Sequence, residues 1–383
     1  MAHPHHLLNT SWTLHRLSPL HHGNNNEPFL CNQRALEIYA TRLRDHLTNS
    51  LADAQGWREE DGSALSNIGA LKSCTWETIS TLSFLNPHQE GLDGDPQQPA
   101  GILVTLAYDT ITYKAALLTT TPSSATQNQK KRRRNNSSSS TYLPLLLTRL
   151  PKALRESFIT FLSANFDTYV SPLRLPSTFI CDVLERYVRS LPMSSTGAGA
   201  GTTSTSLTED ILREMHLTLS FAPPISPALK TLNVSIPRET FTAFLLRISP
   251  ASLSTISSSS AEQIGEKGEN EGGGGGGGSV LSGLEVYLRD HLALELGLNL
   301  PSSGERGLSS GSASLAGGYV RLTRVACAGF VVTGEGKMKI VAKASDLGSE
   351  SGNGGEEDER NMGALRGGEV LLRAVLERAV TGE

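Results

Sequence analysis

The sequence predicts an α+β fold: a mixed, mainly antiparallel curved sheet with packed helices and long disordered insertions. Short segments that alternate apolar and polar residues are interspersed with segments in which apolar residues recur at helical spacing, without a regular βαβ order. Between them lie stretches dominated by Ser, Gly, Thr, Asn and charged residues. Such stretches bury too little apolar surface to offset the chain entropy lost on folding.

Two ordered regions follow from this pattern. Residues 7–192 form an N-terminal α+β region and residues 207–383 form a C-terminal β-rich region. The disordered insertions are expected at residues 119–141 in the first region and at residues 249–279, 302–318 and 345–368 in the second.

The N-terminal region begins with a strand around Trp12, which runs into a turn at Ser18-Pro19. Trp12 and Leu14 fall on one face of this strand and Thr13 and His15 on the other, the alternation of a half-buried strand. The segments that follow are a helix over Asn32–Leu51, an apolar run over Leu71–Leu85, and a hairpin over Gly101–Thr119 that turns near Asp109.

Two helices in series complete this region. The first begins at Pro151, and its apolar stripe extends from Leu154 to Tyr169. The second covers Phe179–Leu191 and ends before Pro192. Their aromatic stripes predict a hydrophobic core.

The C-terminal region contains the clearest strand signals. Alternation predicts strands over Met215–Phe221, over Leu232–Ile236 and within Tyr319–Lys343, where Gly334-Glu335-Gly336 supplies a turn. Helical spacing predicts helices over Arg238–Ile248, Val280–Leu296 and Val370–Val380.

Composition limits the cellular compartments and the kinds of binding partner that are expected. The formal net charge is −4, so no overall field attracts nucleic acid or an anionic membrane. The four cysteines lie far apart without a CxxC pair, which favours free thiols in a reducing compartment. The N-terminus lacks a signal-peptide pattern and no apolar run is long enough to span a bilayer, so we expect a cytosolic or nuclear protein.

No motif predicts a cofactor, a metal site or a catalytic residue. Gly307–Gly311 matches the G-x-S-x-G elbow of serine hydrolases around Ser309, but it lies in a Ser/Gly tract without the required strand before it and helix after it. Gly334-Glu335-Gly336-Lys337 lacks the first glycine and the Ser/Thr of a phosphate loop. The sequence therefore favours a protein that is not an enzyme.

Two groups of basic residues are candidates for binding. The run Lys130, Lys131, Arg132, Arg133 and Arg134 must be solvent-exposed and predicts a nuclear-import signal or a phosphate contact. In the C-terminal hairpin, the DNA-facing candidates are Arg321, Arg324, Lys337, Lys339 and Lys343. A solvated sheet face explains this second group equally well, because antiparallel sheets often expose one side to water. The partner-contact candidates are Met338, Ile340 and Val341, through the apolar side and backbone edge of the same hairpin.

The segment Asn9–His21, read as Asn-Thr-Ser-Trp-Thr-Leu-His-Arg-Leu-Ser-Pro-Leu-His, resembles the N-terminus of the ascomycete branch of the centromere protein L (CENP-L) family of inner-kinetochore subunits. The resemblance implies a non-enzymatic scaffold in the nucleus, at the centromere. It also implies a heterodimer with a CENP-N-like partner, formed through the C-terminal β region, that binds the centromeric nucleosome and its DNA within the constitutive centromere-associated network.

Two other functions remain open at this point. One is a generic nuclear nucleic-acid-binding protein that acts through Lys130–Arg134, and the other is a serine hydrolase that uses Ser309.

Overall fold

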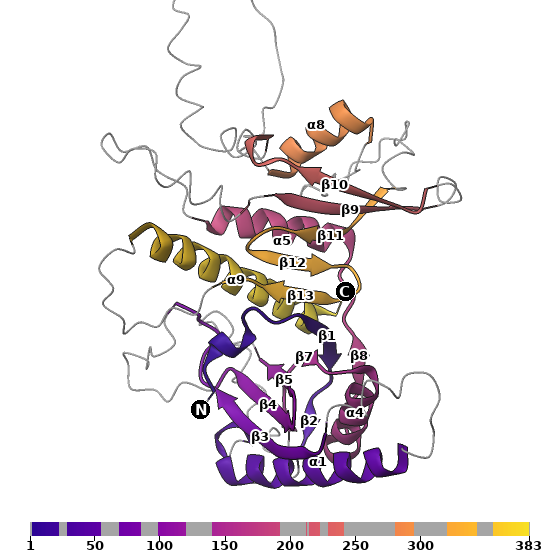
Figure 1. The fold of residues 1–383 in the computed structure, drawn as a ribbon, viewed down its shortest axis with the longest axis vertical. Helices are drawn as coiled ribbons and strands as arrows, with labels where there is room; N and C mark the ends of the chain where they lie inside the picture. The colour runs from indigo at the N-terminus through magenta and orange to yellow at the C-terminus, as the bar shows by residue number, and fades with distance from the viewer. Residues whose placement is uncertain are drawn as a thin grey trace, which may run out of the picture. The chain divides into compact units, whose positions relative to one another are not determined.

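The chain divides into two units (Figure 1). Unit 1 comprises Met1–Arg174, Gly336–Ile340 and Leu372–Glu383, and unit 2 comprises Leu175–Glu335 and Val341–Leu371. The computed structural model describes residues 2–22, 29–54, 69–85, 99–119, 140–191, 212, 214–222, 229–240, 280–294, 320–342 and 355–382.

Unit 1 is built on an antiparallel sheet with the strand order β13-β1-β7-β5-β4-β3. These strands are β13 (Lys337–Ile340), β1 (Trp12–Leu17), β7 (Leu145–Arg149), β5 (Thr112–Leu118), β4 (Gly101–Tyr108) and β3 (Leu71–Ile79). β8 (Val170–Pro172) also pairs with β1, and β2 (Leu20–His21) pairs separately with β6 (Ser140–Thr141). The strand around Trp12 and the hairpin near Asp109 are thus confirmed.

Two helices cover one face of this sheet, α1 (Gln33–Ala54) and α4 (Lys152–Phe166). Their apolar side chains form one core with the facing strand residues, among them Leu36, Leu43, Trp76, Phe158, Phe161 and Phe166. The 3-10 helices η1 (Pro4–Leu7) and η2 (Phe29–Cys31) precede β1 and α1. The predicted hydrophobic role of the aromatic stripe is confirmed.

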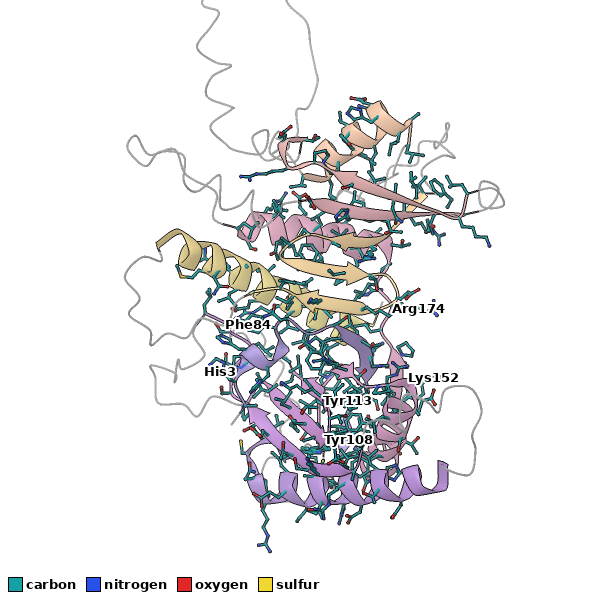
Figure 2. The ribbon with its side chains drawn as sticks, viewed as in Figure 1. His3, Phe84, Tyr108, Tyr113, Lys152 and Arg174 are labelled. Carbon is teal, nitrogen blue, oxygen red and sulfur yellow. The ribbon has the colours of Figure 1, made fainter. Side chains whose placement is uncertain are left out.

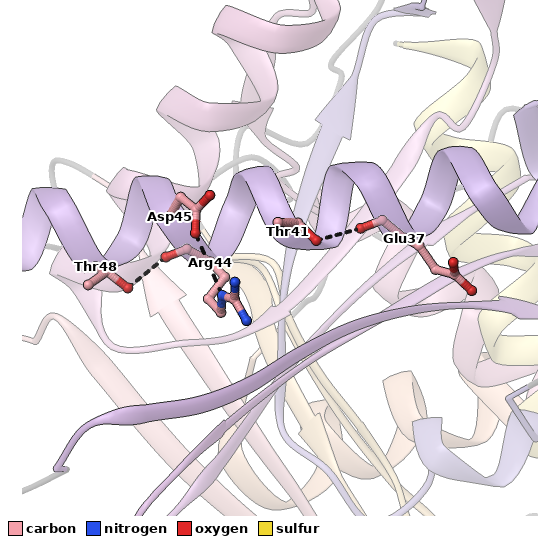
Figure 3. Close-up of polar contacts among 5 residues, drawn as sticks. All are labelled: Glu37, Thr41, Arg44, Asp45 and Thr48. Atoms are coloured by element: carbon pink, nitrogen blue, oxygen red, sulfur yellow. Dashed lines mark hydrogen bonds and ion pairs between the residues drawn. The ribbon is translucent and has the colours of Figure 1, made fainter.

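The exposed side of α1 is polar (Figure 3). The hydroxyls of Thr41 and Thr48 donate hydrogen bonds to the carbonyl oxygens four residues earlier, at 3.0 and 2.8 Å. Arg44 Nε lies 3.6 Å from Asp45 Oδ1. These contacts are local and solvent-exposed, so this side of α1 is stable in water without packing against another element.

β1 is buried on both faces, although its alternation suggests one wet face. Trp12 is 1% exposed, and His15 is also buried. His15 shares a 3.3 Å hydrogen bond with the hydroxyl of Thr148. Burial, followed by the charge of Arg155, lowers the pKa of His15 to about 4, so that its ring is neutral at pH 7. His15 is therefore part of the core.

Unit 2 is built on a four-stranded antiparallel sheet with the order β10-β9-β11-β12. The strands are β10 (Thr231–Ile236), β9 (Met215–Phe221), β11 (Val320–Ala326) and β12 (Phe330–Thr333). α5 (Ser177–Ser190) packs against β11, and α8 (Val280–Leu292) packs against α5. The backbone N–H of Leu322 donates to Ser177 Oγ at 2.9 Å, which joins the start of α5 to the sheet.

The last helix, α9 (Gly355–Thr381), corrects one expected insertion. Residues 345–368 were expected to be disordered, but the chain is helical from Gly355, and Leu365 is buried. The sequence did not predict this part of the helix because glycines interrupt its apolar stripe. Gly367 has a packing role, since a Cβ there would collide with the ring of Tyr187 on α5.

Other boundaries also differ from the predictions. α4 ends at Phe166 because Asp167 adopts a left-handed conformation (φ 45°), so Tyr169 lies outside the helix and is 73% exposed. α8 ends at Leu292, before a left-handed Ala293. Unit 2 begins at Leu175, within the expected N-terminal region, and β13 belongs to unit 1. The α+β class with a mainly antiparallel sheet is confirmed.

Candidate nucleic-acid interface

Two of the predicted DNA-facing residues lie side by side on β11 of unit 2. Arg321 and Arg324 are exposed, whereas Leu322 and Val325 are buried. Residues three apart on a regular strand point to opposite faces. A register shift between Leu322 and Arg324 inserts one extra residue, Thr323, and returns Arg324 to the face of Arg321.

The register of the neighbouring strands places polar side chains in a row beside each arginine. Arg321 lies opposite Ser220 of β9, which lies opposite Thr231 of β10. Arg324 lies in the next row, between Thr333 of β12 and Thr218 of β9, and Asn233 of β10 continues that row. A third row contains His216 and Ser235, both exposed. The result is an exposed face of β9, β10 and β11, referred to below as the basic sheet face.

Hydrogen bonds fix part of this face. The hydroxyl of Thr218 donates to Asn233 Oδ1 at 2.9 Å, which leaves the amide nitrogen of Asn233 as a donor. The hydroxyl of Thr323 donates to the backbone oxygen of Thr218 at 3.0 Å. The face therefore carries an oriented amide donor, that of Asn233, in the same row as Arg324.

The charge of the basic sheet face has one sign. None of the residues of β9, β10, β11 and β12 is acidic. Arginine, hydroxyl and amide groups are the side chains that most often contact nucleic-acid phosphates. A surface with this composition can bind a phosphate backbone.

The other predicted binding residues lie elsewhere. Lys337 is exposed and Lys339 half-buried on β13 in unit 1, so the predicted set is divided between the two units. Met338 and Ile340 are each 1% exposed, and their side chains contribute to the core; Val341 is half-buried. Lys343, Lys130–Arg134 and Ser309 lie outside the described residues.

Sequence reasoning did not single out His216 or Asn233. The signal was present, because the alternation of Met215–Phe221 and Leu232–Ile236 already placed both residues on a polar face. What was missing was the register that brings β9 and β10 beside β11.

The described residues contain no group of three or more His, Cys, Asp or Glu side chains placed to bind a metal ion. The four cysteines are free, as expected. Burial raises the pKa of Cys74 and of Cys181 to about 12 and that of Cys327 to about 11, so these thiols stay protonated and unreactive at neutral pH. In the part of the chain that the structure describes, no helix is both long and apolar enough to cross a membrane.

Together these features define an α+β protein of two units with an open basic sheet face. The family model of centromere protein L matches residues 6–380, nearly the whole chain, and the protein belongs to the CENP-L family. The resemblance seen over Asn9–His21 is thus confirmed, and membership identifies a kinetochore subunit. None of the curated proteins matches the chain.

Proposed function

We propose that the protein is a non-enzymatic structural subunit of the inner kinetochore that pairs with a CENP-N-like protein and links centromeric chromatin to the kinetochore. The observation that carries this proposal is the CENP-L family match over residues 6–380. The proposal places the protein in the nucleus, at the centromere, where Lys130–Arg134 would supply the import signal.

The basic sheet face supports a direct contact with DNA. Arg321 and Arg324 are exposed and lie in adjacent rows of one face. Each phosphate that they neutralise would release a counterion, so the contact would be salt-dependent and independent of sequence. Such a contact suits a subunit that holds chromatin rather than reads a base sequence.

The backbone edge of β10 supports a partner contact. Among the described strands of unit 2, β10 is at the end of the sheet and pairs with β9 on one side. A terminal strand presents unpaired backbone groups to which a partner strand can hydrogen-bond. Of the partner-contact candidates, Met338 and Ile340 have almost no exposed side-chain surface and lie on β13 in unit 1, so this proposal assigns the contact to the edge of β10 in unit 2 and not to them.

One purification tests the proposal. An affinity-tagged chain isolated from its native cells should carry a CENP-N-like subunit in stoichiometric amount. In that complex, Arg321→Gln with Arg324→Gln should leave the partner bound and weaken binding to a labelled DNA duplex of random sequence. The slope of log affinity against log salt should become less steep by about 1.8, because two phosphate contacts are lost.

The matched control is Arg186→Gln in the same unit, since Arg186 already pairs with Asp182 at 2.9 Å. This control should leave both readouts unchanged. Unchanged DNA affinity in the double variant would show that the basic sheet face is only a solvated surface. Recovery of DNA without any kinetochore subunit would favour the generic nucleic-acid-binding alternative, and labelling of Ser309 by a serine-directed probe would favour the hydrolase.

A further inference from the structure

Two cations lie directly opposite each other in the sheet of unit 1. Lys114 of β5 pairs in register with Arg149 of β7, and both point to the face opposite α1 and α4, because Ala115 and Leu146 point into the helix-covered core. Tyr113, labelled in Figure 2, marks this end of β5. Like charges at directly opposed positions destabilise a sheet.

A third basic side chain joins them. His6 of η1 lies with its Nδ1 atom 3.4 Å from Lys114 Nζ, an arrangement in which the lysine donates to a neutral ring. Burial, and then the charge of Lys114, lowers the pKa of His6. Burial, and then the charge of Arg149, lowers the pKa of Lys114. In both groups burial is the larger cause and the neighbouring cation the second, so the Lys114 ammonium lies in a partly desolvated site beside another cation.

No carboxylate in the described part of the chain forms an ion pair with Lys114 or Arg149. The register instead continues the row with two hydroxyls, Thr105 of β4 opposite Lys114 and Thr75 of β3 opposite Thr105. Arg149 and Thr75 are exposed, and Lys114 and Thr105 are half-buried. The row is therefore an accessible line of donors with two uncompensated charges.

We infer that Lys114 and Arg149 form a binding site for an acidic peptide segment of another kinetochore protein, with Thr105 and Thr75 as additional donors. A carboxylate placed between the two cations relieves their repulsion and accepts charge-assisted hydrogen bonds from both. This site lies in unit 1, on different strands from the basic sheet face, and it does not depend on the DNA contact proposed for that face.

The surroundings favour an acidic peptide over DNA. Glu77 of β3 lies close enough to His6 to raise its pKa, and it shares the face of Thr75. A polyanion laid along this row would bring further phosphates against that carboxylate. A peptide can place one or two carboxylates at the cations and neutral residues beside Glu77, so it avoids the repulsion.

The test measures binding and stability together in the full-length chain. The probe is a fluorescein-labelled peptide of glycine and serine that carries two adjacent glutamates, and its binding is followed by anisotropy at low salt. Lys114→Gln and Arg149→Gln should each lower its affinity about tenfold. Each variant should also keep or raise the midpoint of thermal unfolding, by up to about 1–3 °C, because the cross-strand repulsion is gone. A merely structural lysine would not combine lost binding with retained stability.

Lys72→Gln is the matched control, since Lys72 Nζ already pairs with Asp109 Oδ1 at 3.2 Å on the edge strand of the same sheet. It should leave peptide affinity unchanged, and all variants keep the Lys130–Arg134 run. Unchanged affinity for this peptide in both test variants would overturn the inference. So would a lower unfolding midpoint in the exposed Arg149→Gln variant, which would mean that the charge is compensated within the chain. Lost affinity for duplex DNA with retained affinity for the peptide would assign the row to nucleic acid and would also overturn it.

Discussion

Replacing Trp12 by alanine is expected to lower the free energy of unfolding by about 3–5 kcal/mol, the usual cost of deleting a fully buried aromatic side chain. The Trp12 side chain is 1% exposed. Its indole Nε1–H donates to the backbone oxygen of Leu7 at 2.9 Å, so the substitution also leaves a buried acceptor without its donor. Urea unfolding of the purified chain measures the loss.

Tyr169→Ala is the matched control, because that ring is 73% exposed. Its effect should stay within about 0.5 kcal/mol. A loss of less than about 1 kcal/mol in Trp12→Ala would contradict the burial of β1 and would favour a surface role for Trp12.

Gly336→Ala is expected to lower the free energy of unfolding by a similar amount, about 2–6 kcal/mol. Gly336 has φ +79°, a conformation that costs a residue with a Cβ atom about 1–3 kcal/mol. A Cβ there would also lie inside the contact radius of the Leu173 carbonyl oxygen, and this crowding adds about 1–3 kcal/mol. The backbone N–H groups of Leu14 and Leu173 bond to Gly336 O and Leu14 O at 2.8 and 3.0 Å, so little movement is available.

The comparison is Gly334→Ala, two residues earlier, where φ is not in the left-handed region and the nearest atom would be 3.2 Å from the added Cβ. Urea unfolding should place the midpoint of Gly336→Ala well below that of Gly334→Ala. Equal midpoints would mean that the turn before β13 adapts to a side chain, against the geometry described here.

Sequence patterning was sufficient for most elements of the fold. The period-2 alternation located β1, β9 and β10, and the helical spacing located α1, α4 and α5, because these signals are local. The sequence did not predict the start of α9, because the first half of this helix is rich in glycine and charged residues. The sequence also misplaced the end of α4. The helix ends at Phe166 because Asp167 adopts a left-handed conformation, whereas the apolar spacing continues to Tyr169.

The binding surfaces depend on long-range register, which sequence does not contain. Arg321 and Arg324 are three residues apart, so on a regular strand they would point to opposite faces. They share a face because β11 has a bulge between them. Lys114 meets Arg149 only when β5 pairs with β7 across the intervening segment. Conversely, Lys337 and Lys339 follow closely along the sequence but belong to another unit, because β13 pairs with β1.

The most direct measurement of the central claim is the position of the protein in the cell. A fluorescent tag fused to the chain at its own locus should give discrete nuclear foci that coincide with a marker of the centromeric nucleosome. That result is expected of a CENP-L family subunit of the kinetochore. A diffuse nuclear or cytoplasmic signal without centromeric foci, from a tagged chain that is intact and stably expressed, would contradict the account.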